Sequence, residues 1–311
     1  MAIWLRAGRE TVGADARYLR HTSYIGVLYH GLWGAEESMG QRRRRALGQH
    51  WLVEGRYLER IARAAEISPD EVVVEVGAGT GNLTRRLLAI GARVIAVELD
   101  NALARALPER LGGPPNLAVV AGDVLRIPPA DLLSLASVAP PYIVVGNLPY
   151  SIGTAVVRHF LRSPLPPRRM VVTLQREVAE GMAALPGQMS FLSVEMQYFA
   201  EVQVLFIIPP TAFRPPPKVQ SAVVRLDVRR SPPVGVDDVD SFLRVVQAGF
   251  AAPRKQLRNS LAIGLSLAPG QAGEAIAAAG LEAERRPGTL SLEEWARLYR
   301  ALAARRVATG V

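Results

Sequence analysis

The tetrapeptide Asn147-Leu148-Pro149-Tyr150 has the residue types that could hold an exocyclic amine for alkylation. The amine of adenine is a weak nucleophile because its lone pair is delocalised into the ring, so an alkylating enzyme must aim two acceptors at its two N–H groups. An Asn side-chain oxygen supplies one, and a backbone carbonyl held by Pro149 can supply the other, since proline fixes its own φ and extends the residue before it. Tyr150 offers a flat face for the base. The alternative is an ordinary turn at a strand end, because Asn and Pro are turn residues.

A glycine-rich segment, Gly77-Ala78-Gly79-Thr80-Gly81, follows directly on the apolar run Val72–Val76 and precedes a helical pattern. Glycines at a strand-to-helix turn let the backbone approach a ligand closely, and the helix N-terminus adds partial positive charge. Dinucleotide-binding turns have the pattern Gly-x-Gly-x-x-Gly, whereas Asn82 stands where the third glycine is expected. The segment therefore favours a nucleotide-like cofactor, and S-adenosylmethionine over a dinucleotide.

Two acidic residues follow later strands of the same pattern. Glu98 ends the run Arg93–Glu98, and a carboxylate about twenty residues past the glycines is where a ribose diol needs a partner with two acceptors. Asp123 follows the run Leu117–Ala121, where it could accept from the adenine amine of the cofactor. Each acid alone is also explained as a helix N-cap or a solvated turn residue. Together, at corresponding strand ends, they favour a cofactor site.

The composition indicates a folded protein with a polyanionic partner. The 311 residues are 49% hydrophobic, and 37 Lys and Arg against 28 Asp and Glu give a net charge of +9. We therefore expect RNA or DNA as the partner. A codon bias toward Arg is the alternative explanation, because only Lys218 and Lys255 among the basic residues are lysines.

The same composition disfavours several other classes of protein. Cysteine is absent, which leaves no disulfide framework, no thiolate nucleophile and no Cys-based zinc site. The four histidines lack metal-ligand spacing, and no apolar run reaches the ~18 to 20 residues that span a bilayer. We expect a cytoplasmic monomer with no metal and no membrane role.

The chain alternates β-branched runs with amphipathic segments from Gln49 onward, which is typical of βαβ units and a mostly parallel sheet. Strands are expected at residues 72–76, 93–98, 117–121, 142–146 and 170–174. Helices are expected at residues 82–90, 101–111 and 154–161. Two further runs, 202–208 and 222–228, are joined by a Pro-rich loop, which predicts antiparallel pairing.

Three domains follow from these patterns. Residues 1–47 have no strong period and end in Arg42-Arg43-Arg44-Arg45, so we expect a disordered basic extension or an over-long start with the native chain opening at Met39. A signal peptide is the weaker alternative, because His30 interrupts the apolar stretch and no small-residue cleavage site follows. Residues 48–229 form the sheet domain, and residues 230–311 form an all-helical domain rich in Ala, Leu and Arg.

Several short motifs occur in a fixed order between residues 47 and 302. They are Gly48-Gln49-His50-Trp51-Leu52, residues 75–81, Glu98-Leu99-Asp100, Gly122-Asp123, Asn147-Leu148-Pro149-Tyr150, Gln175-Arg176-Glu177-Val178-Ala179 and Phe213-Arg214-Pro215-Pro216-Pro217-Lys218-Val219. With this ordered set the chain resembles the KsgA family, the small-subunit rRNA adenine N6,N6-dimethyltransferases. Two departures from the family are Trp51, where Phe is usual, and a loop after Gly187 that is about two residues shorter.

The resemblance implies an α/β fold, a Rossmann-like S-adenosylmethionine-dependent methyltransferase sheet with a small C-terminal all-helical domain. It implies dimethylation of N6 of two adjacent adenosines in the hairpin near the 3′ end of small-subunit rRNA, during subunit maturation. The expected cofactor contacts are His50, Leu52, Gly77, Gly79, Glu98, Asp123 and Asn147. The expected base clamp is Asn147, Pro149, Tyr150 and Phe213.

Basic clusters mark the expected RNA contacts. They are Arg214 with Lys218, the stretch Arg254, Lys255 and Arg258, and also Arg42 to Arg45 and Arg285 with Arg286. Arg254 and Arg258 have the i, i+4 spacing that would place them on one side of a helix. Each cluster is also explained as a solvated basic face. The expected partner is rRNA of a small-subunit assembly intermediate.

Two rival functions remain. A resistance methyltransferase acting on large-subunit rRNA usually has Ile between the Asn and Pro of the tetrapeptide and lacks the Pro-Pro-Pro-Lys segment, whereas this chain has Leu148 and Pro215-Pro216-Pro217-Lys218. A non-catalytic ribosome-assembly factor would be expected to have lost Glu98, Asp123 or Asn147, and all three are present.

Overall fold

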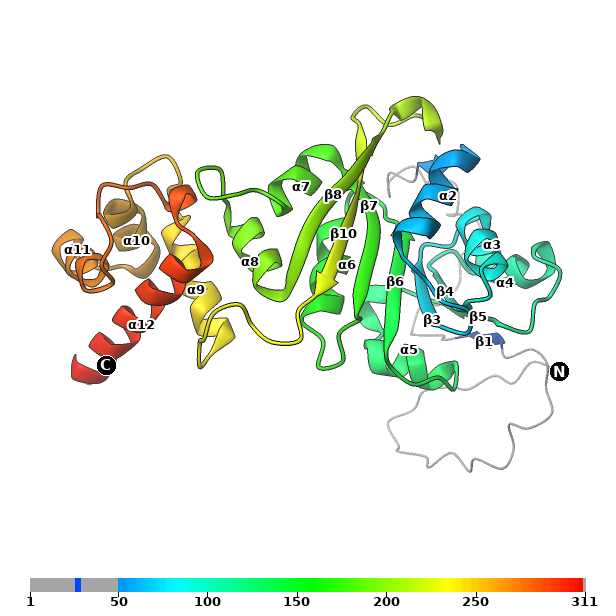
Figure 1. Ribbon diagram of the computed structural model, residues 1–311, viewed down its shortest axis with the longest axis horizontal. Coiled ribbons are helices and arrows are strands. Elements are labelled where there is room, and N and C mark those ends of the chain that lie inside the picture. Colours follow the sequence, from blue (N-terminus) through cyan, green and yellow to red (C-terminus); the bar gives the residue numbers. More distant parts are fainter. Residues whose placement is uncertain (1–25, 29–49, 310–311) are drawn as a thin grey trace, which may run out of the picture. The chain divides into compact units, whose positions relative to one another are not determined.

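The computed structural model describes residues 26–28 and 50–309 and divides the chain into two compact units (Figure 1). The sheet unit comprises residues up to Arg176 together with Gln203–Val228, and the helical unit comprises Glu177–Val202 together with residues from Arg229 on. This division differs from the expected domain of residues 48–229. The reason is that Met189, Val194 and Tyr198 share a hydrophobic core with the C-terminal helices.

The sheet unit is built on an eight-stranded sheet. Its order is β1 (Gly26–Leu28), β5 (Leu117–Ala121), β4 (Arg93–Glu98), β3 (Val72–Val76), β6 (Tyr142–Asn147), β7 (Arg169–Gln175), β10 (Ser221–Val228) and β8 (Ala200–Ile208). In this order, each neighbouring pair from β1 through β5, β4, β3 and β6 to β7 is parallel, and β10 pairs with β7 antiparallel. The strand order reverses between β3 and β6, where α/β sheets bind ligands at the carboxyl ends of their strands.

Helices cover both faces of this sheet. On one face α2 (Gly55–Ala64), α3 (Asn82–Ala89) and α4 (Asn101–Arg110) contribute Leu58, Leu87 and Leu107 to a core shared with the inward residues of the strands. On the other face lie α5 (Pro129–Leu135) and α6 (Gly153–Leu161), and the rings of Phe160 and Tyr142 are 6.4 Å apart. The expected α/β class is therefore confirmed.

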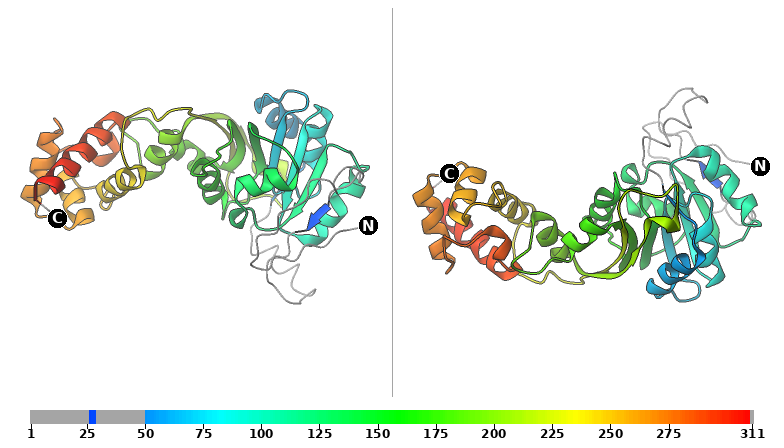
Figure 2. Two further views of the ribbon diagram at one scale, coloured as in Figure 1. Left: turned by 90° about the horizontal axis from the view of Figure 1, so that it is seen from below. Right: turned by 90° about the horizontal axis from the view of Figure 1, so that it is seen from above.

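The helical unit contains α8 (Phe191–Phe199), α9 (Val239–Gly249), α10 (Leu257–Leu265), α11 (Pro269–Ala278) and α12 (Leu292–Thr309), and α7 (Arg176–Met182) leads into it. Figure 2 shows α9 to α12 packed against one another. The buried indole of Trp295 lies against α9 where glycine leaves room for it, because a Cβ on Gly249 would be 2.3 Å from the ring. The expected all-helical character of the C-terminal segment agrees with this arrangement.

The start of the chain contributes one short strand. Residues 26–28 pair with β5, which departs from the disorder expected for these three residues, and the rest of the expected basic extension, including Arg42 to Arg45, lies outside the described residues. Within residues 26–28 and 50–309, no helix is long and apolar enough to cross a membrane. The same residues contain no group of three or more His, Asp or Glu arranged to hold a metal ion.

Candidate active site

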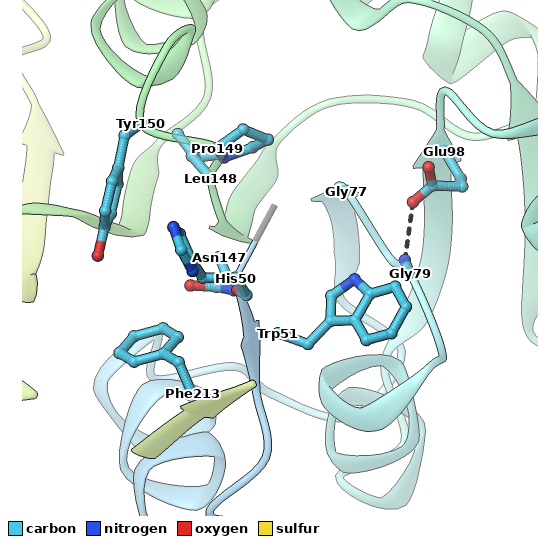
Figure 3. A pocket seen from close by; sticks show the side chains of 10 residues that line it. All are labelled: His50, Trp51, Gly77, Gly79, Glu98, Asn147, Leu148, Pro149, Tyr150 and Phe213. Carbon is cyan, nitrogen blue, oxygen red and sulfur yellow. Dashed lines mark hydrogen bonds between the residues drawn. The ribbon is translucent and has the colours of Figure 1, made fainter. Parts of the chain in front are cut away.

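A pocket lies at the carboxyl ends of the central strands, beside a second, small sheet. This sheet pairs β2 (Trp51–Leu52) with β9 (Phe213–Arg214) in antiparallel register, and the Val53 N–H donates to the carbonyl of Ala212 at 3.0 Å. Figure 3 shows the residues that line the pocket: His50, Trp51, Gly77, Gly79, Glu98, Asn147, Leu148, Pro149, Tyr150 and Phe213. The structure thus brings together residues from several of the motifs found in the sequence.

The glycine turn forms one end of the pocket. Gly77 and Gly79 have φ of +75° and +56°, a backbone conformation that residues with a side chain rarely adopt. Backbone without side chains therefore faces the pocket at these positions. Gly81 serves packing, since a Cβ there would lie 2.7 Å from the side chain of Leu107. It is also the left-handed N-cap of α3, whose positive N-terminal end follows the turn. This end of the pocket suits the backbone approach of a nucleotide-like ligand.

Glu98 lies beside the glycine turn and is only 3% exposed. Its carboxylate accepts hydrogen bonds from the Gly79 N–H at 2.8 Å and from the Asp100 N–H at 2.9 Å. Burial raises the pKa of Glu98, and these two backbone donors offset part of that effect. Each carboxylate oxygen has a further lone pair, so the group can also accept from the two hydroxyls of a ribose.

Asn147 ends strand β6 at the other end of the pocket. Its Nδ2 donates to the main-chain carbonyl of His50 at 3.0 Å. Because a carbonyl oxygen only accepts, the amide cannot be flipped without placing Oδ1 against that oxygen. The amide is therefore held with Oδ1 available as an acceptor, which is the orientation that an amine clamp requires.

Aromatic side chains surround Asn147. Figure 3 shows Tyr150, Asn147 and Phe213 grouped at one end of the pocket, with Glu98 and the glycine turn at the other. The Tyr150 hydroxyl lies 2.6 Å from the Ser221 hydroxyl, and burial raises the pKa of Tyr150. Phe213 extends from β9 and is 1% exposed. The carbonyl of Pro149 accepts from the N–H groups at the start of α6, which fixes the chain after Asn147.

Two expected cofactor residues do not line the pocket. Leu52 is buried in the core of the sheet unit. Asp123 caps the 3-10 helix η2 (Val124–Arg126), because its Oδ1 accepts from the Leu125 N–H at 3.1 Å and its Oδ2 lies 3.6 Å from Arg126. The N-cap explanation considered for Asp123 is thus realised in the structure.

Other residues at or near the site were given no role from sequence. Trp51 lines the pocket with 37% of its surface exposed, and its alternation with buried Leu52 is the period of a strand. Ser221 carries no sequence signal, because its partner Tyr150 is far away in the chain.

Glu75 does have a sequence signal, an acid within a run of valines. It is 1% exposed, and its Oε2 lacks a hydrogen-bond partner. Its pKa is raised from 4.5 to about 7, mainly by burial and also by the charge of Glu98, while hydrogen bonding to Thr84 opposes the rise.

The basic residues expected to contact RNA lie in both units. In the sheet unit, residues 214–219 form the proline loop, which carries exposed Arg214 and Lys218. In the helical unit Arg254, Lys255 and Arg258 are exposed, and Arg258 Nη1 is 3.6 Å from Glu284.

Two predictions about the basic clusters are wrong. Arg254 does not share a helix with Arg258, since α10 begins at Leu257 and Arg254 lies in the preceding turn. Arg285 is not available to phosphate in the way expected, because Glu294 pairs with its guanidinium at 2.5 Å and Thr289 accepts from it. Arg286 remains exposed.

Known proteins resemble this chain over most of its length. The family described as ribosomal RNA adenine dimethylase matches residues 40–304. The ribosomal RNA small subunit methyltransferase A of Moorella thermoacetica (strain ATCC 39073 / JCM 9320) is 41% identical over 266 residues, covering 83% of this chain and 92% of the relative. The protein of the same name from Dehalococcoides mccartyi (strain CBDB1) is 40% identical over 256 residues, covering 82% of this chain and 87% of the relative.

Solved structures agree with this match. The 23S rRNA methyltransferase ErmE is 31% identical with a TM-score of 0.64, covering 81% of this chain and 99% of that protein. A dimethyladenosine transferase from Plasmodium falciparum has a TM-score of 0.69 at 23% identity, covering 84% of this chain and 99% of that protein, and shows the same fold. The motifs, the fold and these matches agree that the chain belongs to the ribosomal RNA adenine dimethylase family, the KsgA family of methyltransferases, and is an enzyme.

Proposed function

We propose that this enzyme transfers methyl groups from S-adenosylmethionine to N6 of two adjacent adenosines in the 3′-terminal hairpin of small-subunit rRNA, during maturation of that subunit. One observation carries the proposal: a single pocket joins the buried acid and bare glycine backbone at one end to Asn147, Tyr150 and Phe213 at the other. A donor and an extruded base could therefore meet within it.

The residues at the glycine end fit the donor. Glu98 would accept from both ribose hydroxyls, and the backbone of Gly77 and Gly79 would lie against the nucleoside. The main chain of the segment from His50 to Leu52 would border the donor, and Asp123, whose Oδ1 caps η2, would accept from its adenine amine through Oδ2. When bound, the donor supplies a methyl group on a positively charged sulfur, open to in-line displacement.

The residues at the aromatic end fit the acceptor. Asn147 Oδ1 would accept one N–H of the adenine amine and the carbonyl of Leu148 the other, since the carbonyl of Pro149 already accepts from α6. Tyr150 and Phe213 would hold the flipped base. Unstacking a base costs a few kcal/mol, which aromatic stacking of ~1 to 3 kcal/mol per base can offset.

The chemistry needs positioning more than acid–base catalysis. The two acceptors polarise the amine toward the sulfonium, and the proton is lost afterwards to water. A monomethylated amine retains a single N–H, so it can donate to only one of the two acceptors when it binds again. The second transfer therefore depends more on stacking against Tyr150 and Phe213.

The exposed basic residues would bind the RNA backbone. Arg214 and Lys218 flank the prolines of the proline loop, and Arg254, Lys255 and Arg258 gather before and at the start of α10. A structured hairpin is recognised through its shape and phosphate spacing rather than through a base code. We propose that the enzyme acts as a cytoplasmic monomer on an assembly intermediate.

The rival substrate is large-subunit rRNA, which the name of the structural relative ErmE contains. The higher identity to small-subunit methyltransferases, together with Leu148 and the Pro-Pro-Pro-Lys segment, supports the small subunit. A non-catalytic assembly factor is disfavoured because Glu98 and Asn147 share one pocket.

The test is to incubate the protein with labelled S-adenosylmethionine and either unmethylated small subunits or unmethylated large subunits, and then to map the label on the RNA. The proposal expects label on N6 of two adjacent adenosines near the 3′ end of small-subunit rRNA. Label confined to large-subunit RNA would assign the rival substrate. Binding of subunits without any label would assign the assembly-factor role.

A further inference from the structure

The side chain of His50 connects two segments that are far apart in the sequence. Its Nδ1 lies 2.7 Å from the carbonyl oxygen of Pro215, 165 positions away. Because a carbonyl oxygen only accepts hydrogen bonds, Nδ1 must carry the hydrogen and donate. The imidazole of His50, the residue just before β2, therefore links the proline loop to the start of this strand.

The main chain of the same residue orients the clamp. The His50 carbonyl accepts from Asn147 Nδ2 at 3.0 Å, and this hydrogen bond decides which atom of the amide remains as an acceptor. The position of that carbonyl follows the position of β2. Any shift of β2 relative to β6 therefore turns the Asn147 amide away from the orientation that the amine needs.

Strand β2 is short and depends on its partners for its place. It contains Trp51 and Leu52, which pair with Arg214 and Phe213 of β9. A two-residue pairing makes few hydrogen bonds, so a further bond at its end contributes a large share of its stability. The His50 to Pro215 bond lies at that end, and the ring of His50 is also 5.6 Å from the ring of Tyr150, centroid to centroid.

We propose that His50 is a positioning residue that couples the proline loop to the amine clamp. Its imidazole holds the loop, and its carbonyl holds Asn147, so binding of RNA to Arg214 or Lys218 is transmitted to the acceptor that polarises the amine. The proposal rests on the proposed function. It gives the His50 side chain a role in orienting the acceptor end of the pocket, distinct from binding the donor.

The test compares His50→Asn with His50→Leu. Asparagine carries an N–H at the same δ position as Nδ1 and can still donate to Pro215, whereas leucine has similar size and no donor. Three quantities are measured: the single-turnover methylation rate on saturating small subunits, the Kd for S-adenosylmethionine by calorimetry, and the hydrogen exchange of the Val53 and Arg214 amides in the pairing of β2 with β9.

For His50→Leu we expect the rate to fall about tenfold or more and the Val53 and Arg214 amides to exchange faster, with the Kd for the donor changed by less than about twofold. His50→Asn, which keeps a donor for the Pro215 carbonyl, is expected to recover most of the rate and of the amide protection that His50→Leu loses. The proposal is overturned if His50→Leu leaves rate and exchange unchanged, or if the Kd weakens by the same factor as the rate. Should the wild-type protein methylate nothing, the proposed function fails, and the exchange measurement still decides whether His50 anchors β9.

Discussion

The hydroxyl of Tyr150 and the hydroxyl of Ser221 lie 2.6 Å apart, joining the turn after β6 to the first residue of β10. This bond fixes the aromatic ring at the edge of the pocket, with one face toward the position proposed for the base. The ring and its anchor make separable contributions, since stacking needs the ring and only its placement needs the hydroxyl.

Removing the hydrogen bond between Tyr150 and Ser221 should lower the methylation rate less than removing the ring of Tyr150. We expect Tyr150→Phe and Ser221→Ala to lower the methylation rate by similar factors of at most about tenfold, the worth of one hydrogen bond. Tyr150→Ala should lower it further, because stacking contributes ~1 to 3 kcal/mol per base. Single-turnover rates on unmethylated subunits measure the difference. Equal rates for Tyr150→Ala and Tyr150→Phe would show that the ring of Tyr150 does not stack on the base.

Glu98 is expected to set donor affinity. In Glu98→Gln one carboxylate oxygen becomes an N–H₂ group, which cannot accept, so one of the two N–H groups of Gly79 and Asp100 loses its acceptor and one ribose hydroxyl does too. We expect the Kd for S-adenosylmethionine to weaken by about tenfold or more, measured by calorimetry without RNA. Asp131→Asn, on α5 and outside the pocket lining, is the control and should bind as the wild type does. An unchanged Kd in Glu98→Gln would exclude the ribose interaction.

Glu75 predicts an unusual pH dependence of stability. Its pKa is raised from 4.5 to about 7 in the folded protein, mainly because burial disfavours the charged form. The folded chain therefore binds more protons than the unfolded chain between these two pKa values. The free energy of unfolding falls as pH rises through this window, because Glu75 must ionise in a buried position. This loss of stability, the penalty of ionising Glu75, is complete above about pH 7. At about 1.4 kcal/mol per pKa unit the penalty is on the order of 3 kcal/mol.

The variant Glu75→Gln removes the ionisable group while keeping its size. We expect its melting temperature to exceed that of the wild-type protein at a pH above about 7, with the advantage shrinking as the pH falls toward 4.5. Thermal unfolding followed by circular dichroism at several pH values gives the comparison. A pH-independent difference between the two proteins would show that Glu75 is not neutral in the fold.

The exposed basic residues before α10 should contribute electrostatically to RNA binding. We expect the double variant Arg254→Gln and Lys255→Gln to weaken subunit binding and to reduce the slope of log K against log salt by about 1 for each phosphate that is no longer neutralised. Arg244→Gln is the matched control, since Arg244 lies on the neighbouring helix α9 beside Asp238. Binding that is equally strong at low and high salt in the wild-type protein would contradict the role of these residues in binding phosphate.

The parallel sheet could be predicted from the sequence because its strands are buried on both faces and appear as continuous β-branched runs. The runs 72–76, 93–98 and 117–121 coincide with β3, β4 and β5. The glycine turn and the tetrapeptide lie at the ends of such strands, so their meeting in one pocket followed from the topology. Local sequence patterns are enough to predict an element where its packing depends on residues that are close to one another in the sequence.

The rest depended on interactions between distant residues. Strands β2 and β9 have two residues each, too few to show a period, and their pairing joins positions near 51 to positions near 213. The helical unit takes in Glu177–Val202 because of shared core packing, which no local signal records. The sequence does not show that Arg285 pairs with Glu294, because the nine positions between them match no helical or strand period.

The central claim is that Asn147 Oδ1 polarises the adenine amine, and the single-turnover methylation rate of Asn147→Ala tests it most directly. Removing one preorganised polar group that faces the reacting atom typically costs about a hundredfold to a thousandfold in rate, so the variant should show almost no dimethylation. Its affinity for small subunits, measured in parallel, should stay close to that of the wild-type protein, which shows that the RNA is still held. Dimethylation by Asn147→Ala at the wild-type rate would contradict the account.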